Sequence, residues 1–165
     1  MAAGSLRVVA PEVTQATNDK EQLAPMIGKL QELRKPLGRT KRMLADSGYL
    51  SEKNVQCCAA AGIEPLIAIK RQRHHQSWRQ RFAAAPKRPP DSATAMEKMR
   101  HRLKTPAGRK LYALRKQTPE PVFGIIKSTM GFRQFLLRGL QNVKGEWSLV
   151  TMSWNLKRMF ALQGC

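Results

Sequence analysis

Apolar residues recur at helical spacing in two segments of the first part of the chain. Residues 20–34 carry apolar side chains at intervals of three and four, which predicts an amphipathic helix. Its apolar face consists of Leu23, Met26, Ile27, Leu30 and Leu33. A second helix is predicted over residues 52–61, because Ser51 is a good N-terminal cap and Gly62 ends the pattern.

Three short apolar runs alternate with these helices and read as strands. They are Leu6–Val9, Met43–Ala45 and Pro65–Ile69. The last run is continuous, as in strands that are buried on both faces of a sheet. The order strand, helix, strand, helix, strand indicates an α/β fold with a largely parallel central sheet and flanking helices.

The later part of the chain reads as a series of helices. One is predicted from Thr105 to a break at Thr118, and the next starts at Pro119 with Thr118 as its cap. Two more are predicted at Phe132–Leu140 and Gly145–Leu162. The last helix is expected to face a core with Trp147, Val150, Trp154 and Phe160.

A basic stretch at about residues 70–104 separates these two parts and is predicted to be an irregular insertion in one domain of residues 1–165. A short helix is expected near residues 76–85. Arginines stand close to Trp78 and Phe82, a mixture that suits phosphate contacts and base stacking. The candidate DNA-binding residues here are Arg71, Arg73 and Arg79. A solvated linker is the other interpretation.

The charge of the chain points to a polyanionic partner. The 165 residues carry a net charge of +19, and twenty-one of the thirty Lys and Arg residues lie from Lys70 onward. Nucleic acid is therefore the expected partner, whereas no strongly apolar basic helix supports a membrane surface. No run of residues is long and apolar enough for a membrane span or a signal peptide. The adjacent Cys57 and Cys58 suit a reducing compartment, so we expect a cytoplasmic protein.

Two carboxylates stand where metal-dependent chemistry would need them. Asp46 follows the predicted strand at residues 43–45, and the carboxyl ends of strands are where α/β sheets place their sites. Glu120 and Lys127 are seven residues apart, so a helix would put both on one face. A carboxylate could bind a divalent ion there while the lysine meets a phosphate. The alternatives are a turn-forming Asp46 and a solvated Glu120.

Four segments, in order along nearly the whole chain, carry a resemblance to a known family. They read VTQATNDKEQL, LADSGYLSEKNV, YALRKQTPEPVFGIIKSTMGFRQFLLRGL and GEWSLVTMSWNLKRM. Together they closely resemble the C-terminal part of bacterial insertion-sequence transposases. The resemblance implies a DDE catalytic domain with a ribonuclease H-like fold of three layers, in which helices flank the central sheet.

The resemblance also assigns roles to individual residues. The family's second catalytic Asp follows a strand in an Asp-x-Gly-Tyr turn, which Asp46 matches together with Gly48 and Tyr49. The signature around the catalytic Glu maps onto Tyr112, Arg115, Glu120 and Lys127. Four residues separate Arg115 from Glu120, where the usual signature has three, so the role of Arg115 is less well defined.

The activity that the resemblance implies is DNA transposition by phosphoryl transfer. Asp46 and Glu120 would bind divalent metal, Mg²⁺ or Mn²⁺, while Tyr112, Arg115 and Lys127 would contact DNA. The implied partners are the transposon ends and the target DNA. A homodimer is compatible with this activity, and neither a membrane nor a small-molecule substrate is expected.

No residue matches the family's first catalytic Asp, which lies on the first strand of the fold. Glu12 and Asp19 are the acids near the start, and neither lies where that Asp is expected. We therefore expect an N-terminally truncated fragment of a transposase that is inactive alone. The alternative is a non-catalytic DNA-binding remnant or a regulator of transposition.

Overall fold

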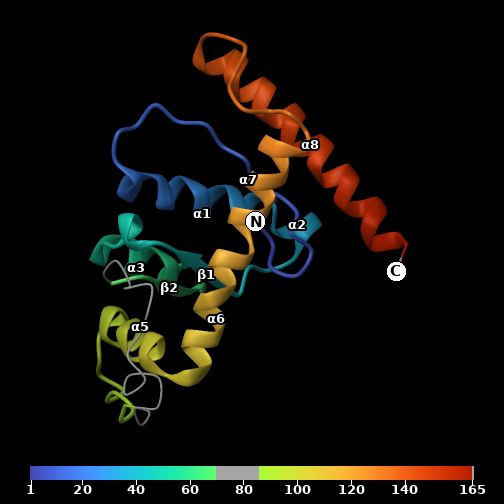
Figure 1. Cartoon of the computed structure of the whole chain (residues 1–165). Coiled ribbons are helices and arrows are strands. Elements are labelled where there is room, and N and C mark those ends of the chain that lie inside the picture. The colour runs from blue at the N-terminus through green and yellow to red at the C-terminus, as the bar shows by residue number, and fades with distance from the viewer. Residues whose placement is uncertain (70–85, 165) are drawn as a thin grey trace. The chain divides into compact units, whose positions relative to one another are not determined.

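The computed structural model describes residues 1–69 and 86–164 (Figure 1). The chain divides into two compact units. The first unit combines Met1–Thr17 with Leu114–Cys165, and the second unit is Asn18–Ala113. Each unit has its own buried core.

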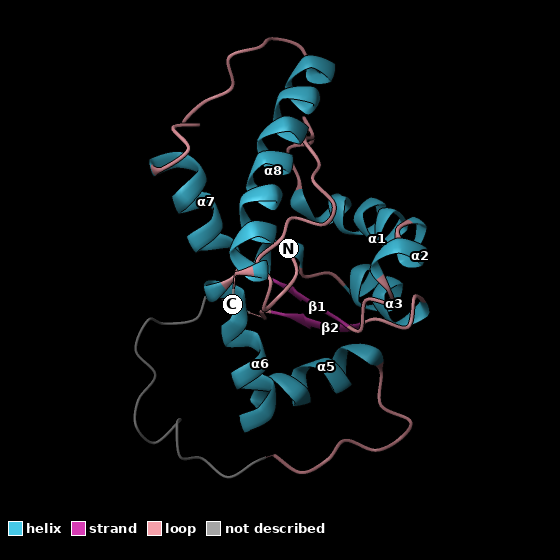
Figure 2. Cartoon of the chain, turned by 90° about the vertical axis from the view of Figure 1, so that its right-hand side faces the viewer, coloured by secondary structure: helices cyan, strands magenta, loops and turns pink. Residues whose placement is uncertain are grey.

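A parallel pair of strands forms the centre of the second unit (Figure 2). Strand β1 is Arg42–Ala45, strand β2 is Glu64–Ile67, and helix α3, Glu52–Ala60, connects them. The strands are in register from Arg42 opposite Glu64 to Ala45 opposite Ile67. The predicted parallel sheet is thus confirmed for these two strands, which are the strands present among the described residues.

Helices α1 at Leu23–Glu32, α3, and α5 at Ala95–Lys104 pack on one face of this sheet. The short 3-10 helix η1 at Asp19–Gln22 precedes α1, and α2 at Arg34–Leu37 follows it. The core between the sheet and α1, α3 and α5 is built from Leu23, Ile27, Val55, Cys58, Ile63, Ile67 and Met99. The burial of Leu23 and Ile27 confirms the predicted apolar face of α1.

The opposite face of the sheet is covered as well. Leu66 and Ala68 alternate with Ile67 and so point away from it, where they form a second buried cluster with Tyr112. Tyr112 belongs to helix α6, Pro106–Gln117. The prediction of a sheet with flanking helices is therefore confirmed for this unit, although two strands are fewer than the predicted sheet contains.

Helix α5 corrects the predicted boundaries of the insertion. The sequence predicts an irregular insertion at residues 70–104, which is wrong for residues 95–104. The Thr94 hydroxyl accepts a hydrogen bond from the Glu97 amide, and the Glu97 carboxylate accepts one from the Thr94 amide at 2.8 Å. This capping box starts the helix, and the burial of Met99 attaches it to the core. The helix predicted near residues 76–85 lies outside the described residues.

Two helices and the N-terminal segment form the first unit. Helix α7 is Pro119–Ser128 and helix α8 is Leu140–Gln163. Their core consists of Val8, Val122, Ile126 and Trp154. The prediction of a proline in the first turn of α7 is confirmed, but the Thr118 hydroxyl does not cap it and donates instead to the Leu114 carbonyl.

The predicted strand at Leu6–Val9 is wrong, because side chains of α8 bind its backbone. The Asn155 amide accepts a hydrogen bond from the Val8 N–H and donates one to the Val8 carbonyl, both at 2.8 Å. The Trp154 indole N–H donates to the Leu6 carbonyl at 2.9 Å. Leu6 itself has a φ of 58°, which a regular strand does not contain.

The predicted helix at residues 132–140 is also wrong, since residues 131–139 form a loop between α7 and α8. Gly131 and Gly139, at the two ends of this loop, have φ values of 73° and 84°. These values lie in the left-handed region that favours glycine, so neither residue can be part of a regular α-helix. Helix α8 starts five residues before its predicted beginning. Trp154 is buried as predicted, whereas Phe160 is 73% exposed.

Candidate active site

Asp46 lies directly after β1 and forms a tight turn there. Its Oδ1 accepts a hydrogen bond from the Gly48 N–H at 3.1 Å and caps the short 3-10 helix η2 at Ser47–Tyr49. The predicted position at the carboxyl end of a strand is therefore confirmed. The turn also gives Asp46 a local structural role, which is the alternative interpretation of this residue.

A second carboxylate, which the sequence analysis did not assign, lies beside Asp46. A Cβ atom built on Gly48 would lie 3.2 Å from Asp46 Oδ1 and 3.4 Å from Asp19 Oδ2. Both carboxylates thus flank the same glycine, whose missing side chain leaves room for them. No spacing rule pairs Asp19 with Asp46, because α1 and β1 separate them in the sequence.

This pair of carboxylates affects the pKa of the Tyr49 phenol. Burial raises its pKa above the usual value, and the negative charges of Asp19 and Asp46 raise it further. The same negative field attracts a cation, and carboxylate oxygens are the ligands that Mg²⁺ prefers. The pair fits part of a metal site. Among residues 1–69 and 86–164, no group of three or more His, Cys, Asp or Glu side chains could hold a metal ion.

Helix α7 carries the second predicted carboxylate. Glu120 is in its first turn and Lys127 in its last turn, both exposed, and their spacing of seven residues places them on one face. Phe123 lies between them on that face and stacks on Trp147 of α8, with ring centroids 5.8 Å apart. Asp46 belongs to the second unit and Glu120 to the first, so their approach to one another stays a prediction.

The remaining predicted DNA contacts differ in their surroundings. Tyr112 is only 8% exposed and packs against Leu66 and Ala68, which favours a role in the core. Arg115 is half-buried near the end of α6, and a helix boundary at Thr118 separates it from Glu120. The three arginines predicted within the insertion, Arg71, Arg73 and Arg79, lie outside the described residues.

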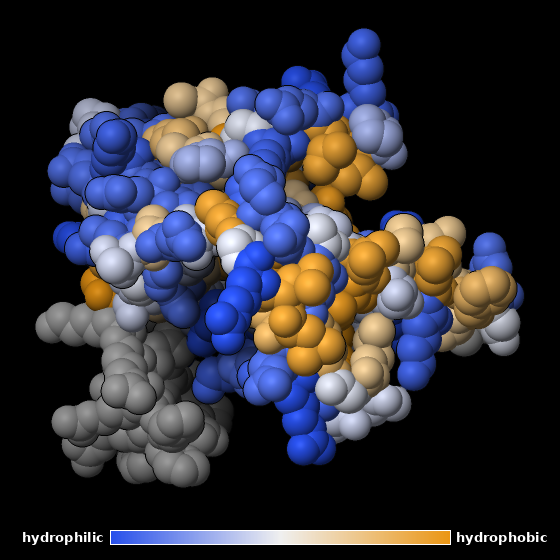
Figure 3. Space-filling view, turned by 90° about the horizontal axis from the view of Figure 1, so that it is seen from above, coloured by the Kyte–Doolittle hydropathy of each residue, from blue (hydrophilic) through white to orange (hydrophobic). Residues whose placement is uncertain are grey.

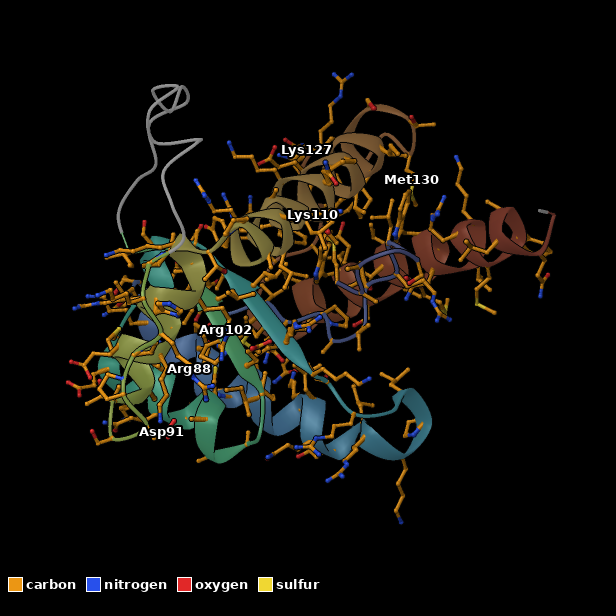
Figure 4. All side chains as sticks on the ribbon, turned by 90° about the horizontal axis from the view of Figure 1, so that it is seen from below. Arg88, Asp91, Arg102, Lys110, Lys127 and Met130 are labelled. Atoms are coloured by element: carbon orange, nitrogen blue, oxygen red, sulfur yellow. The ribbon has the colours of Figure 1, made fainter. Side chains whose placement is uncertain are left out.

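Basic side chains of α5 surround a hollow that the sequence analysis did not identify. Lys98, His101 and Arg102 line it, together with the segment from Arg88 to Asp91, and its volume is about 390 Å³. Arg88, Asp91 and Arg102 are labelled in Figure 4. Arg102 also forms an ion pair with Glu64 at 2.6 Å. The sequence contained a signal for this basic surface, because α5 carries five Lys, Arg or His residues among its ten.

Comparison with known protein families gives a match over more than half of the chain. A family model described as a transposase DDE domain matches residues 56–160. The matched range includes Glu120 and Lys127 and begins after Asp46. No curated protein and no solved structure matches the chain. Within the described part of the chain, no helix has the length and apolar character needed to cross a membrane.

Proposed function

Because the chain belongs to the transposase DDE domain family, we propose that it takes part in DNA transposition by metal-dependent phosphoryl transfer. Its substrate is DNA at the ends of a mobile element, and Asp46 and Glu120 are the proposed ligands of Mg²⁺ or Mn²⁺. The observation that carries the proposal is the exposed face of α7, where Glu120 and Lys127 lie within the matched residues.

The residues on this face suit the two tasks of such a site. A bound Mg²⁺ supplies activation of the attacking oxygen and stabilisation of the leaving oxygen. The Glu120 carboxylate is a hard oxygen ligand for that ion. The Lys127 ammonium lies on the same face, where it can neutralise a phosphate of the DNA strand as a point charge.

Asp46 is the proposed second ligand, and the carboxylate of Asp19 lies beside it and adds negative charge at the same place. Two neighbouring carboxylates repel each other when both are ionised, and a divalent cation between them relieves this repulsion. No acidic residue of the printed sequence matches the family's first Asp. The proposal therefore includes a further carboxylate ligand, and Asp19 is the candidate because its carboxylate lies beside Asp46.

A second candidate function is non-catalytic DNA binding, as in a regulator of transposition. The net charge of +19 favours it, because charge alone provides strong, sequence-independent affinity for DNA. This candidate predicts DNA binding that falls steeply with salt and does not depend on metal or on Glu120.

Mn²⁺ binding, followed by electron paramagnetic resonance in the presence of duplex DNA, tests the proposal. We expect Asp46→Asn and Glu120→Gln each to weaken Mn²⁺ binding at least tenfold, or about 1.4 kcal/mol. Glu32→Gln, an exposed carboxylate at the end of α1, is the matched control and should leave Mn²⁺ binding unchanged. Asp19→Asn tests whether Asp19 is the further ligand.

Normal Mn²⁺ binding by both Asp46→Asn and Glu120→Gln would contradict the catalytic assignment. If those variants still bind DNA with a steep salt dependence, the second candidate function accounts for the chain. If only Glu120→Gln weakens Mn²⁺ binding, the face of α7 keeps its role and Asp46 is a turn residue.

A further inference from the structure

The loop at residues 131–139, between α7 and α8, exposes apolar and basic side chains together. Leu136 is 76% exposed, and its neighbours Phe135 and Leu137 are also exposed. Arg133 and Arg138 stand on either side of these three residues, and both are exposed. Contiguous exposed apolar side chains rimmed by charged ones are characteristic of an interaction site.

The loop has a defined conformation. The Glu146 carboxylate of α8 accepts hydrogen bonds from the Leu136 N–H, at 2.9 Å, and from the Leu137 N–H, at 3.1 Å. At its beginning, the Phe132 N–H donates to the Ile126 carbonyl of α7 at 3.1 Å. The backbone at Leu136 and Leu137 is therefore fixed by α8 while their side chains remain in solvent.

An aromatic cluster connects this loop to the face of α7 that carries Glu120 and Lys127. Trp147 of α8 stacks on Phe123, and it also contacts Phe132 at 6.1 Å and Phe135 at 6.2 Å between ring centroids. Lys127 and Met130 mark the end of α7, where the loop begins (Figure 4). The exposed loop and the proposed catalytic face are thus neighbouring parts of one packed structure.

We propose that the 131–139 loop is a DNA-binding wedge that contacts the element end beside the reacting phosphodiester. Arg133 and Arg138 bind phosphates, and Leu136 and Leu137 contact the faces of bases that have come apart at that end. Proteins that distort DNA insert apolar side chains between bases in this way. The inference rests on the proposed function, since it uses Glu120 to locate the reacting phosphodiester.

Charge complementarity favours DNA as the occupant of this surface. Lys127, Arg133 and Arg138 are positive and exposed. The nearby acid, Glu146, already accepts two amide hydrogen bonds, which are the right partners for its negative charge. Exposed leucines between two arginines match the apolar base faces and charged backbone of a frayed duplex end.

Fluorescence anisotropy of the full chain with two short duplexes tests the inference. One duplex is fully paired, the other has mismatches at its end, and EDTA is present so that metal binding plays no part. We expect the wild type to prefer the mismatched end, and Leu136→Ser with Leu137→Ser to reduce this preference about tenfold. Leu149→Ser, at a 61% exposed position of α8, is the matched control and should leave it unchanged.

The arginines have their own expected result. Arg133→Gln with Arg138→Gln should weaken binding of both duplexes equally and lower the slope of log affinity against log salt by about two. Lys157→Gln, an exposed charge on α8, is the control for a general loss of positive charge. Circular dichroism establishes whether each variant is folded. If the double leucine variant does not fold, Leu136→Ser alone replaces it in the binding assay.

Three outcomes would overturn the wedge. They are a wild type without preference for the mismatched end, leucine variants that retain the preference, and a self-associated chain that Leu136→Ser converts to monomers in sedimentation. The last outcome would assign the surface to a second copy of the chain. Because the assay contains no metal, these outcomes are independent of the Mn²⁺ experiment on Asp46 and Glu120.

Discussion

In the unit of residues 18–113, hydrogen bonds between β1 and β2 and caps at the helix ends account for the local structure. In the other unit, side chains of α8 instead bind the backbone of the N-terminal segment, almost the whole chain length away in sequence. The surfaces differ as well. Of the exposed large apolar residues among those described, Leu37 alone belongs to the unit of residues 18–113, and the rest belong to the unit with α7 and α8.

This contrast indicates that the two units have different roles. The unit with β1 and β2 buries its apolar residues on both faces of a sheet and carries the Asp46 turn with the Asp19 carboxylate beside it. The unit with α7 and α8 leaves apolar side chains at its surface. Figure 3 shows one face of the molecule, on which orange apolar areas lie among blue ones. A surface of that kind is suited to binding a partner, as the proposal for the loop requires.

Trp154→Ala gives the largest expected effect. Trp154 is 2% exposed, is central to the core of the unit with α7 and α8, and donates to the Leu6 carbonyl. Its loss should lower the free energy of unfolding of this unit by about 3–5 kcal/mol. Urea denaturation measures the change. Phe160→Ala, at an exposed position of the same helix, should cost far less, and equal costs would contradict the packing described for α8.

The contrast between the units also explains what the sequence could predict. Strands β1 and β2, helix α3 and the position of Asp46 follow from local signals: short apolar runs, Ser51 as a cap and the left-handed Gly62. The parallel pairing followed from the alternation of strands and helices, with no need to know distant contacts.

Predictions failed where distant side chains decide the structure. The apolar run at Leu6–Val9 resembles a strand, yet Asn155 and Trp154 satisfy its backbone groups. The apolar pattern after Phe132 resembles a helix, yet Glu146 binds the amides that a helix would use. Neither partner can be recognised from local spacing. The pairing of Asp19 with Asp46 was missed for the same reason.

Asn155→Ala isolates the long-range contact with a smaller effect. Its side chain makes two hydrogen bonds to Val8, and their loss should cost about 2 kcal/mol of local stability. Hydrogen exchange at the Val8 amide, followed by nuclear magnetic resonance, should then be about thirtyfold faster. Asn142→Ala is the control, because Asn142 donates to the nearby Arg138 carbonyl within its own region. Unchanged exchange at Val8 would show that packing alone orders the N-terminal segment.

Glu97→Gln tests the local capping of α5 and gives the smallest expected effect. The hydrogen bonds from the Thr94 amide and hydroxyl lower the pKa of the Glu97 carboxyl in the folded chain. A lowered pKa means that the carboxylate stabilises the fold above its unfolded pKa, and that this contribution disappears as the pH falls through the folded value. The wild type should therefore be slightly more stable than Glu97→Gln at neutral pH, and the difference should vanish in acid.

Thermal denaturation of wild type and Glu97→Gln between neutral and acidic pH measures this difference in stability. A difference that is independent of pH would mean that the carboxylate charge has no part in capping α5, and that the helix depends on the burial of Met99 instead.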